Sequence, residues 1–176
     1  MNGDISVISE DEQIRRFAAS RKEHFEINNK VFPANEDLLL GAMGQNVEIV
    51  LDVDLGECRT FELNVLRRWD RSEYTAVRFY RIPGAAENVV SIDSTHASMA
   101  PEAAAFPPLS APVLPEKDGC LRLHVFVYDG NVEVFANGKK CLAGKVFPSK
   151  DDSKLVSITA IGSAAVLRHL DLWQIK

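Results

Sequence analysis

Short segments in which apolar and polar residues alternate recur along most of this chain. The alternation is seen in residues 47–53, 60–67, 73–81, 88–93, 121–127, 132–134, 154–161 and 164–175. Successive side chains of a β-strand point to opposite faces, so this period indicates strands with one buried face. Glycine and proline separate the segments, as at Pro83-Gly84 and Asp129-Gly130. About eight or nine short strands with turns between them predict an all-β fold of antiparallel strands, a sandwich or a barrel.

A helix is expected only near the start of the chain. Ser9 and Glu12 fit a capping box, in which the serine caps the helix and the glutamate reaches back. Ile14 and Phe17 then fall on one face and should dock the helix on the sandwich. We therefore divide the chain into residues 1–24, a helix and linker, and residues 25–176, the β-sandwich.

One region does not follow the alternation. Residues 97–118 contain five prolines, and we interpret them as an extended loop that crosses from one sheet to the other. The alternative is a linker between two domains. Neither half of the chain has enough strands to bury a core alone, so the loop is the preferred interpretation.

Length and charge narrow the class of protein. The chain has 176 residues, which suits one domain, and its net charge of −5 argues against a nucleic-acid partner. Three cysteines, Cys58, Cys120 and Cys141, without a CxxC pair favour free thiols. No apolar run approaches a membrane span, and the acidic N-terminus lacks a signal peptide, so the sequence as written predicts a cytoplasmic protein. That expectation lapses if the chain is a fragment.

The sequence offers no motif for catalysis, a metal or a cofactor. The four histidines, His24, His96, His124 and His169, are far apart and share no metal-ligand spacing. The run Asp93-Ser94-Thr95-His96 is better explained as a turn held by the Asp and Ser side chains than as a nucleophile with its base. We therefore predict no catalytic residue, no metal site and no cofactor.

Two aromatic residues are candidate carbohydrate-binding residues. Trp69 lies in the polar turn RRWDRSE, and Tyr128 lies at the hairpin turn Tyr-Asp-Gly-Asn. Flat rings bind sugars by stacking against their apolar face. The alternative for both is packing against a neighbouring domain or loop. Trp173 has apolar neighbours in its strand and is expected in the core or an interface.

Several ordered motifs resemble the C-terminal β-sandwich of glycoside hydrolase family 32, the invertases, levanases and other β-fructosidases. They are Phe126-Val127, Val132-Glu133-Val134-Phe135, Asn137-Gly138, Phe147-Pro148 and Leu170-Asp171-Leu172-Trp173-Gln174-Ile175, with SEYTAVRFYR and VVSIDSTHAS upstream. The likeness covers about residues 10 to 176. It implies a two-sheet antiparallel β-sandwich, a concanavalin-like jelly roll with one short N-terminal helix.

This chain departs from the family at two points. Tyr128 and Gly130 stand where the family has an Asp and a Ser, so the hairpin uses different turn chemistry. The family's catalytic motifs, N-D-P-N-G and R-D-P, belong to an N-terminal five-bladed propeller and do not occur here. Glu57-Cys58 matches the family's E-C motif only superficially. Glu57 has no partner motif, and we assign it to a connection between strands.

These observations lead to three hypotheses. The first is a non-catalytic C-terminal module that supports the propeller catalytic domain of a β-fructosidase, in the same chain or absent. The second is a free-standing lectin-like module that binds a fructose-containing carbohydrate. The third is a structural domain that forms homo-oligomers without a ligand. Neither a nucleic acid nor a membrane is an expected partner.

Overall fold

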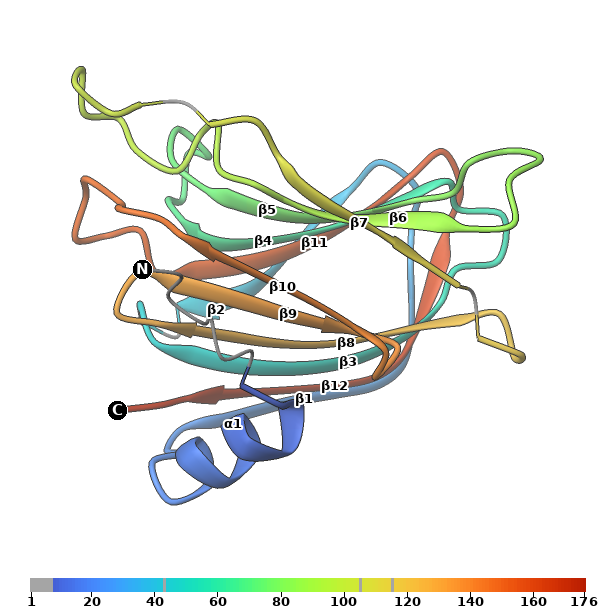
Figure 1. The fold of residues 1–176 in the computed structure, drawn as a ribbon, viewed down its shortest axis with the longest axis horizontal. Helices are drawn as coiled ribbons and strands as arrows, with labels where there is room; N and C mark the ends of the chain where they lie inside the picture. The colour runs from blue at the N-terminus through green and yellow to red at the C-terminus, as the bar shows by residue number, and fades with distance from the viewer. Residues whose placement is uncertain (1–7, 43, 105, 115) are drawn as a thin grey trace, which may run out of the picture.

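Two six-stranded antiparallel sheets and one helix make up the described part of the chain (Figure 1). The computed structural model describes residues 8–42, 44–104, 106–114 and 116–176. The first sheet runs in the order β1 (His24–Phe32), β12 (Ala165–Gln174), β3 (Val47–Asp54), β8 (Cys120–Tyr128), β9 (Asn131–Ala136) and β10 (Lys140–Lys145). The second runs in the order β2 (Asp37–Ala42), β11 (Leu155–Ile161), β4 (Thr60–Arg67), β5 (Thr75–Tyr80), β6 (Asn88–Asp93) and β7 (Leu109–Val113). The predicted all-β sandwich is confirmed.

The core lies between the two sheets and is built by the alternating residues. The inward-facing side chains of β3 and β4, such as Ile49, Leu51, Phe61 and Leu63, are at most 2% exposed. They belong to one hydrophobic cluster with the inward-facing apolar residues of β8, β9, β11 and β12. Because every second residue of a strand faces the same way, the period-two pattern supplies a continuous apolar layer from each sheet.

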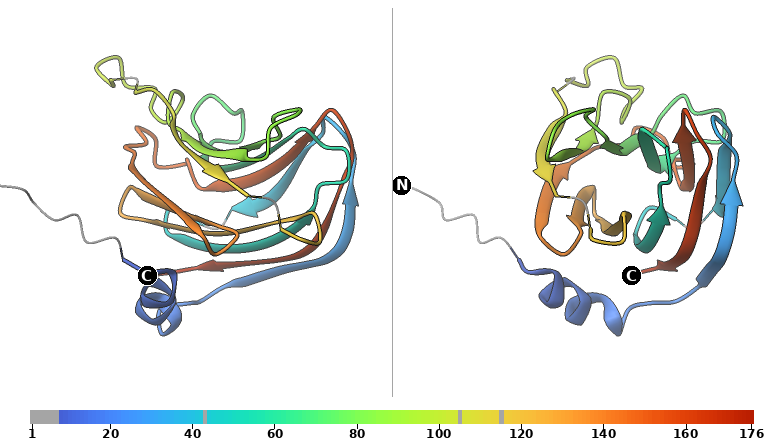
Figure 2. Two further views of the ribbon diagram at one scale, coloured as in Figure 1. Left: turned by 45° about the vertical axis from the view of Figure 1, so that its right-hand side comes forward. Right: turned by 90° about the vertical axis from the view of Figure 1, so that its right-hand side faces the viewer.

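The helix α1 (Glu10–Ala18) packs on the outer face of the first sheet, outside the sandwich (Figure 2). The Ser9 hydroxyl accepts a hydrogen bond from the backbone N–H of Glu12 at 3.2 Å, so the predicted N-cap is confirmed. Phe17 is 5% exposed and Ile14 packs beside it, as expected. The helix adds a second, smaller hydrophobic cluster to the fold. The division of the chain at residue 25 stays a prediction.

Four strands extend the fold beyond those read from the pattern: β1, β2, β7 and β10. β7 lies inside the proline-rich region, at the edge of the second sheet, and its residues pair with β6. The single loop predicted over residues 97–118 is therefore wrong in part. The chain does cross to the first sheet, but only after Val113, on its way to β8.

β12 is irregular at Arg168, and this affects its pairing with both neighbouring strands. On the β3 side, Leu167 pairs with Val53 and His169 pairs with Asp52, so Arg168 is an extra residue in β12. In β1, Asn29 has a φ of +50° at the same level, between the residues paired with Leu167 and His169. Such bulges re-aim side chains. Here Leu167 and Leu170 both face the core, and His169 between them points outward.

Candidate functional site

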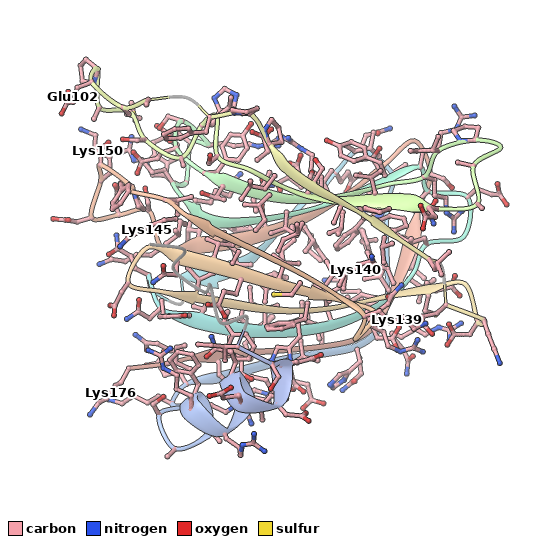
Figure 3. The ribbon with its side chains drawn as sticks, viewed as in Figure 1. Glu102, Lys139, Lys140, Lys145, Lys150 and Lys176 are labelled. Atoms are coloured by element: carbon pink, nitrogen blue, oxygen red, sulfur yellow. The ribbon has the colours of Figure 1, made fainter. Side chains whose placement is uncertain are left out.

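Three loops gather at one end of the sandwich, on the left of Figure 1. They are residues 68–74 between β4 and β5, residues 94–108 between β6 and β7, and residues 146–154 between β10 and β11. We call the described residues of these loops the loop end. Figure 3 shows Glu102, Lys145 and Lys150 on this side of the molecule and Lys139 and Lys140 toward the opposite end. A buried carboxylate, an exposed tryptophan and a cleft all lie at the loop end.

A buried carboxylate, Glu73, ties the three loops together. Its oxygens accept five hydrogen bonds, from the backbone N–H groups of Met99, Ser149 and Lys150 and from the hydroxyls of Ser149 and Ser153. The residue is 0% exposed. Burial raises the pKa of Glu73, but the serine and backbone hydrogen bonds outweigh it, and the pKa lies below its ordinary value. The loop end is therefore held by a charged residue.

Trp69 projects from this end and is 72% exposed, as its polar turn predicted. Arg67 donates from Nη1 to the carbonyl oxygens of Arg68 and Trp69, at 2.7 and 3.1 Å, which fixes the backbone beneath the ring. The indole borders a shallow hollow that is also lined by Asp151, Asp152, Lys154 and Leu155. A flat ring beside charged groups is suited to stacking against a sugar, or to contact with a neighbouring protein.

A larger cleft lies on the other side of the loop that contains Ser149. Its volume is about 540 Å³, and it lies between the proline-rich segment and the end of β10. Phe106 and Phe147 on its walls are 64% and 68% exposed. Ser94, Glu102 and Lys145 add polar groups to its lining. The cleft thus combines apolar rings with a few polar groups, which is typical of ligand and partner sites.

Tyr128, the second candidate aromatic residue, does not present an exposed ring. Its side chain is 9% exposed. Phe17 packs on the ring with centroids 4.9 Å apart, and the guanidinium of Arg16 lies 4.8 Å from the ring centroid. The hydroxyl donates to Glu133 at 2.6 Å. Docking of α1, which a local pattern cannot place, covers this residue, so of the two candidate rings Trp69 is the exposed one.

A chain of charged side chains connects α1 to the first sheet. Arg21 donates from Nε and Nη2 to both oxygens of Glu48, at 2.8 and 2.6 Å. The two ring nitrogens of His124 lie 2.9 Å from Glu10 Oε1 and 2.8 Å from Glu48 Oε1. Burial raises the pKa of Glu48, but the contacts with Arg21 and His124 outweigh it and lower the pKa. His124 therefore lies at the interface between the helix and the first sheet.

The other residues considered for chemistry in the sequence lie in connections or turns, or are free thiols. Glu57 and Cys58 lie between β3 and β4, as expected for a strand connection. Asp93 Oδ1 accepts from the backbone N–H of Thr95 at 3.0 Å, so the segment before His96 is a turn. Cys58, Cys120 and Cys141 are free thiols, as predicted. In the part of the chain that the structure describes, no helix is long and apolar enough to cross a membrane.

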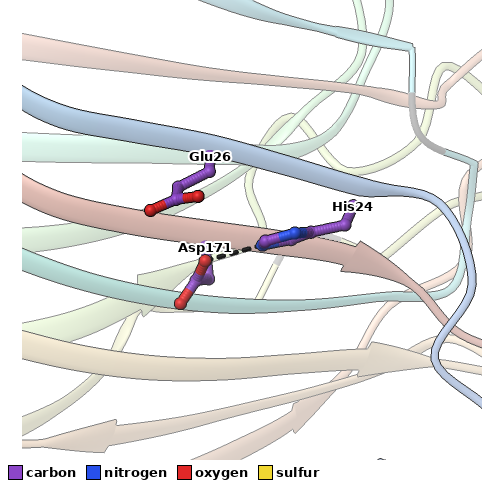
Figure 4. A group of neighbouring side chains, drawn as sticks. All are labelled: His24, Glu26 and Asp171. Carbon is purple, nitrogen blue, oxygen red and sulfur yellow. Dashed lines mark hydrogen bonds and ion pairs between the residues drawn. The ribbon is translucent and has the colours of Figure 1, made fainter.

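The spacing of residues along the sequence did not predict one group of neighbouring side chains. His24 and Glu26 of β1 and Asp171 of β12 point outward from the first sheet, and their ligand atoms lie within 4.8 Å of one another (Figure 4). His24 Nε2 is 2.6 Å from Asp171 Oδ1. Burial raises the pKa of Asp171, but the contacts with His24 and His169 outweigh it and lower the pKa. Imidazole nitrogens and carboxylate oxygens are metal ligands.

Comparison with known families gives one match. Residues 12–174 match the family model described as "Glycosyl hydrolases family 32 C terminal". This match covers nearly the whole chain. A comparison with curated proteins gives no match.

Solved structures of fructosidases share the fold. Fructan 1-exohydrolase IIa from Cichorium intybus superposes with a TM-score of 0.80 at 12% identity, over 93% of this chain and 37% of its own. Exo-inulinase from Aspergillus awamori superposes with a TM-score of 0.73 at 18% identity, over 91% of this chain and 31% of its own. β-Fructofuranosidase from Aspergillus kawachii superposes with a TM-score of 0.74 at 13% identity, over 93% of this chain and 29% of its own. The chain therefore spans about a third of the length of these structures.

Proposed function

Because the chain belongs to the family of C-terminal domains of family 32 glycosyl hydrolases, we propose that it is a non-catalytic module that supports the catalytic domain of a β-fructosidase. The family match over residues 12–174 carries this proposal. The structures that share the fold are those of fructosidases, and they are about three times as long as this chain. The resemblance assigns the chemistry to a catalytic propeller, carried by the same polypeptide or by a separate one.

The loop end is the surface we propose for contact with that catalytic domain. Trp69, Met99, Phe106 and Phe147 expose between 45% and 72% of their surface there. Exposed apolar groups gathered in one region mark an interaction surface, because covering them removes apolar area from water. The five hydrogen bonds to Glu73 hold the backbone beneath them. A fixed backbone lowers the entropy lost when two surfaces associate.

Hydrogen exchange tests the contact surface. Amide exchange would be measured for the chain alone and for the chain mixed with the catalytic propeller of a family 32 β-fructosidase. In the mixture, slower exchange is expected in residues 68–74, 94–104 and 146–154. Phe147→Ser should weaken association. Ile82→Ser is the matched control, since Ile82 is 46% exposed but lies in the connection between β5 and β6. Protection confined to other surfaces, or equal effects of the two substitutions, would contradict the loop end as the contact.

Carbohydrate binding by Trp69 is the second candidate function. The open indole beside Asp152 and Lys154 favours it, since stacking and polar contacts together hold a sugar. An NMR titration with sucrose and with inulin- and levan-type oligosaccharides should shift signals around Trp69 and leave Trp173 unchanged. Trp69→Ala should abolish these shifts while the spectrum stays folded. Shifts that persist in the variant would place the sugar elsewhere.

A further inference from the structure

The outward-facing residues of β1 and β12 form three opposed pairs. His24 lies opposite Trp173, Glu26 opposite Asp171, and Asn28 opposite His169. His169, Asp171 and Trp173 share this face because alternate residues of β12 point the same way after the bulge at Arg168. Two imidazoles and two carboxylates from opposite ends of the chain thus meet on the outer surface of one strand pair. This group is separate from the loop end and does not depend on the proposed function.

The central pair is unfavourable without a cation. Carboxylates directly opposite each other on paired strands repel, and Glu26 and Asp171 stand in that relation. Both oxygens of Asp171 contact an imidazole: His24 Nε2 is 2.6 Å from one, and His169 Nε2 is 2.7 Å from the other. Arg21 is engaged with Glu48 instead. Two carboxylates and two imidazoles thus share this face, and a divalent cation would balance the charge of the carboxylates.

Neighbouring side chains hold these groups in place. The His24 ring stacks on Trp173 with centroids 5.0 Å apart and an angle of 7° between the planes. Asn28 donates from Nδ2 to Glu26 at 2.5 Å, and its Oδ1 lies 2.7 Å from His169 Nδ1. Outer partners of this kind orient metal ligands and fix the imidazole tautomer. The amide of Asn28 therefore links a carboxylate and an imidazole of the group.

We propose that His24, Glu26 and Asp171 bind a divalent transition metal, with Zn²⁺ the best match, and that His169, which contacts the second oxygen of Asp171, completes the set as fourth ligand by a side-chain rotation. Two nitrogen and two oxygen donors suit zinc, which accepts His nitrogens and carboxylate oxygens at about 2.0–2.2 Å in a tetrahedral array. Ligand atoms around such an ion are roughly 3.3 Å apart. When the ion binds Nε2 of His24, any proton on that nitrogen would move to Nδ1 or to solvent, and the contact between His24 and Asp171 would lengthen by a small side-chain rotation. The metal would then fasten β1, an edge strand, to β12.

Calorimetry with the tag-free chain tests the site. After dialysis against EDTA, titration with ZnCl₂ should give one saturable site, and zinc should raise the melting temperature because it binds only the folded arrangement. His24→Gln and Asp171→Asn should abolish both effects. Asn28→Ala, which keeps all four ligands, should weaken binding by about 10–100-fold. His96→Gln is the control, a histidine that also stacks on an aromatic ring, Tyr74, at 5.1 Å.

Tryptophan fluorescence gives a local readout. Trp69 and Trp173 are the two tryptophans of the sequence, so Trp69→Phe leaves Trp173 beside His24 as the only reporter. Cu²⁺ bound at His24 should quench Trp173 saturably at one equivalent, and Asp171→Asn in this background should remove the quenching. The proposal is overturned if zinc gives no saturable site, or if His24→Gln and Asp171→Asn, shown to be folded by circular dichroism, bind it as tightly as the parent chain.

Discussion

His124 and Glu48 meet beneath the helix, with His124 Nε2 2.8 Å from Glu48 Oε1. Glu48 is 0% exposed, and its other oxygen accepts from Arg21. The carboxylate is thus the centre of a buried charged group that joins β3 to β8 and to the segment after α1. Buried charges of this kind are stable only while their partners remain.

Replacement of this carboxylate should therefore be costly. Glu48→Gln places amide donors against Arg21 and His124, and we expect a loss of about 3 kcal/mol in the free energy of unfolding, measured with urea. Glu23→Gln, at an exposed position nearby, should change it by no more than about 0.5 kcal/mol. Equal, small effects of the two substitutions would show that the buried group contributes little.

Glu73 should make stability depend on acid pH. Its folded-state pKa is lowered, so its contribution is fully present above the ordinary pKa of about 4.3 and is lost as the pH falls through the folded-state value. Glu73→Gln should cost about 2–3 kcal/mol at neutral pH. It should also reduce the fall in stability between about pH 5 and pH 3, leaving the part due to the other carboxylates with a lowered pKa, such as Glu48, Asp93 and Asp171. Parallel pH profiles of variant and parent would contradict this role.

The helix should open independently of the sandwich. Phe17 holds α1 in a cluster apart from the main core, through stacking on Phe126 at 5.6 Å and Tyr128 at 4.9 Å. Phe17→Ala removes about 3 kcal/mol of packing. Hydrogen exchange should then show loss of protection in residues 10–18 and exposure of Tyr128, while β3 and β4 stay protected. Arg15→Ala, on the exposed side of the helix, is the control. Uniform loss of protection would mean that helix and sandwich unfold together.

The hairpin between β8 and β9 contains a glycine that no other residue can replace without strain. Gly130 has a φ of +75°, and a Cβ there would lie 2.5 Å from the carbonyl oxygen of Val146. Gly138 also has a positive φ, +61°, but open space around it. Gly138→Ala should cost about 1 kcal/mol, and Gly130→Ala distinctly more because backbone must also shift. Equal losses in thermal unfolding would show that the turn adjusts freely.

The sequence predicted the sheets well where the alternation is unbroken, as in β3, β4 and β8. It did not predict β1, because the left-handed Asn29 shifts the alternation between Ile27 and Phe32. Trp69 was predicted to be exposed because its own turn is polar. The burial of Tyr128 and the approach of His24 to Asp171 depend on contacts between residues more than 100 positions apart, which local patterns do not encode.

The non-catalytic assignment is tested most directly by assaying the purified chain alone with sucrose, inulin and levan for release of reducing sugar. Retaining glycosidases need two carboxyl groups about 5–5.5 Å apart across the scissile bond, within a site that holds the sugar. Glu57 is exposed in a strand connection, and Glu26 and Asp171 lie on the outer face of a sheet. The account predicts no release above that of buffer. Release that rises with chain concentration and disappears in Glu57→Gln or Glu26→Gln would contradict it.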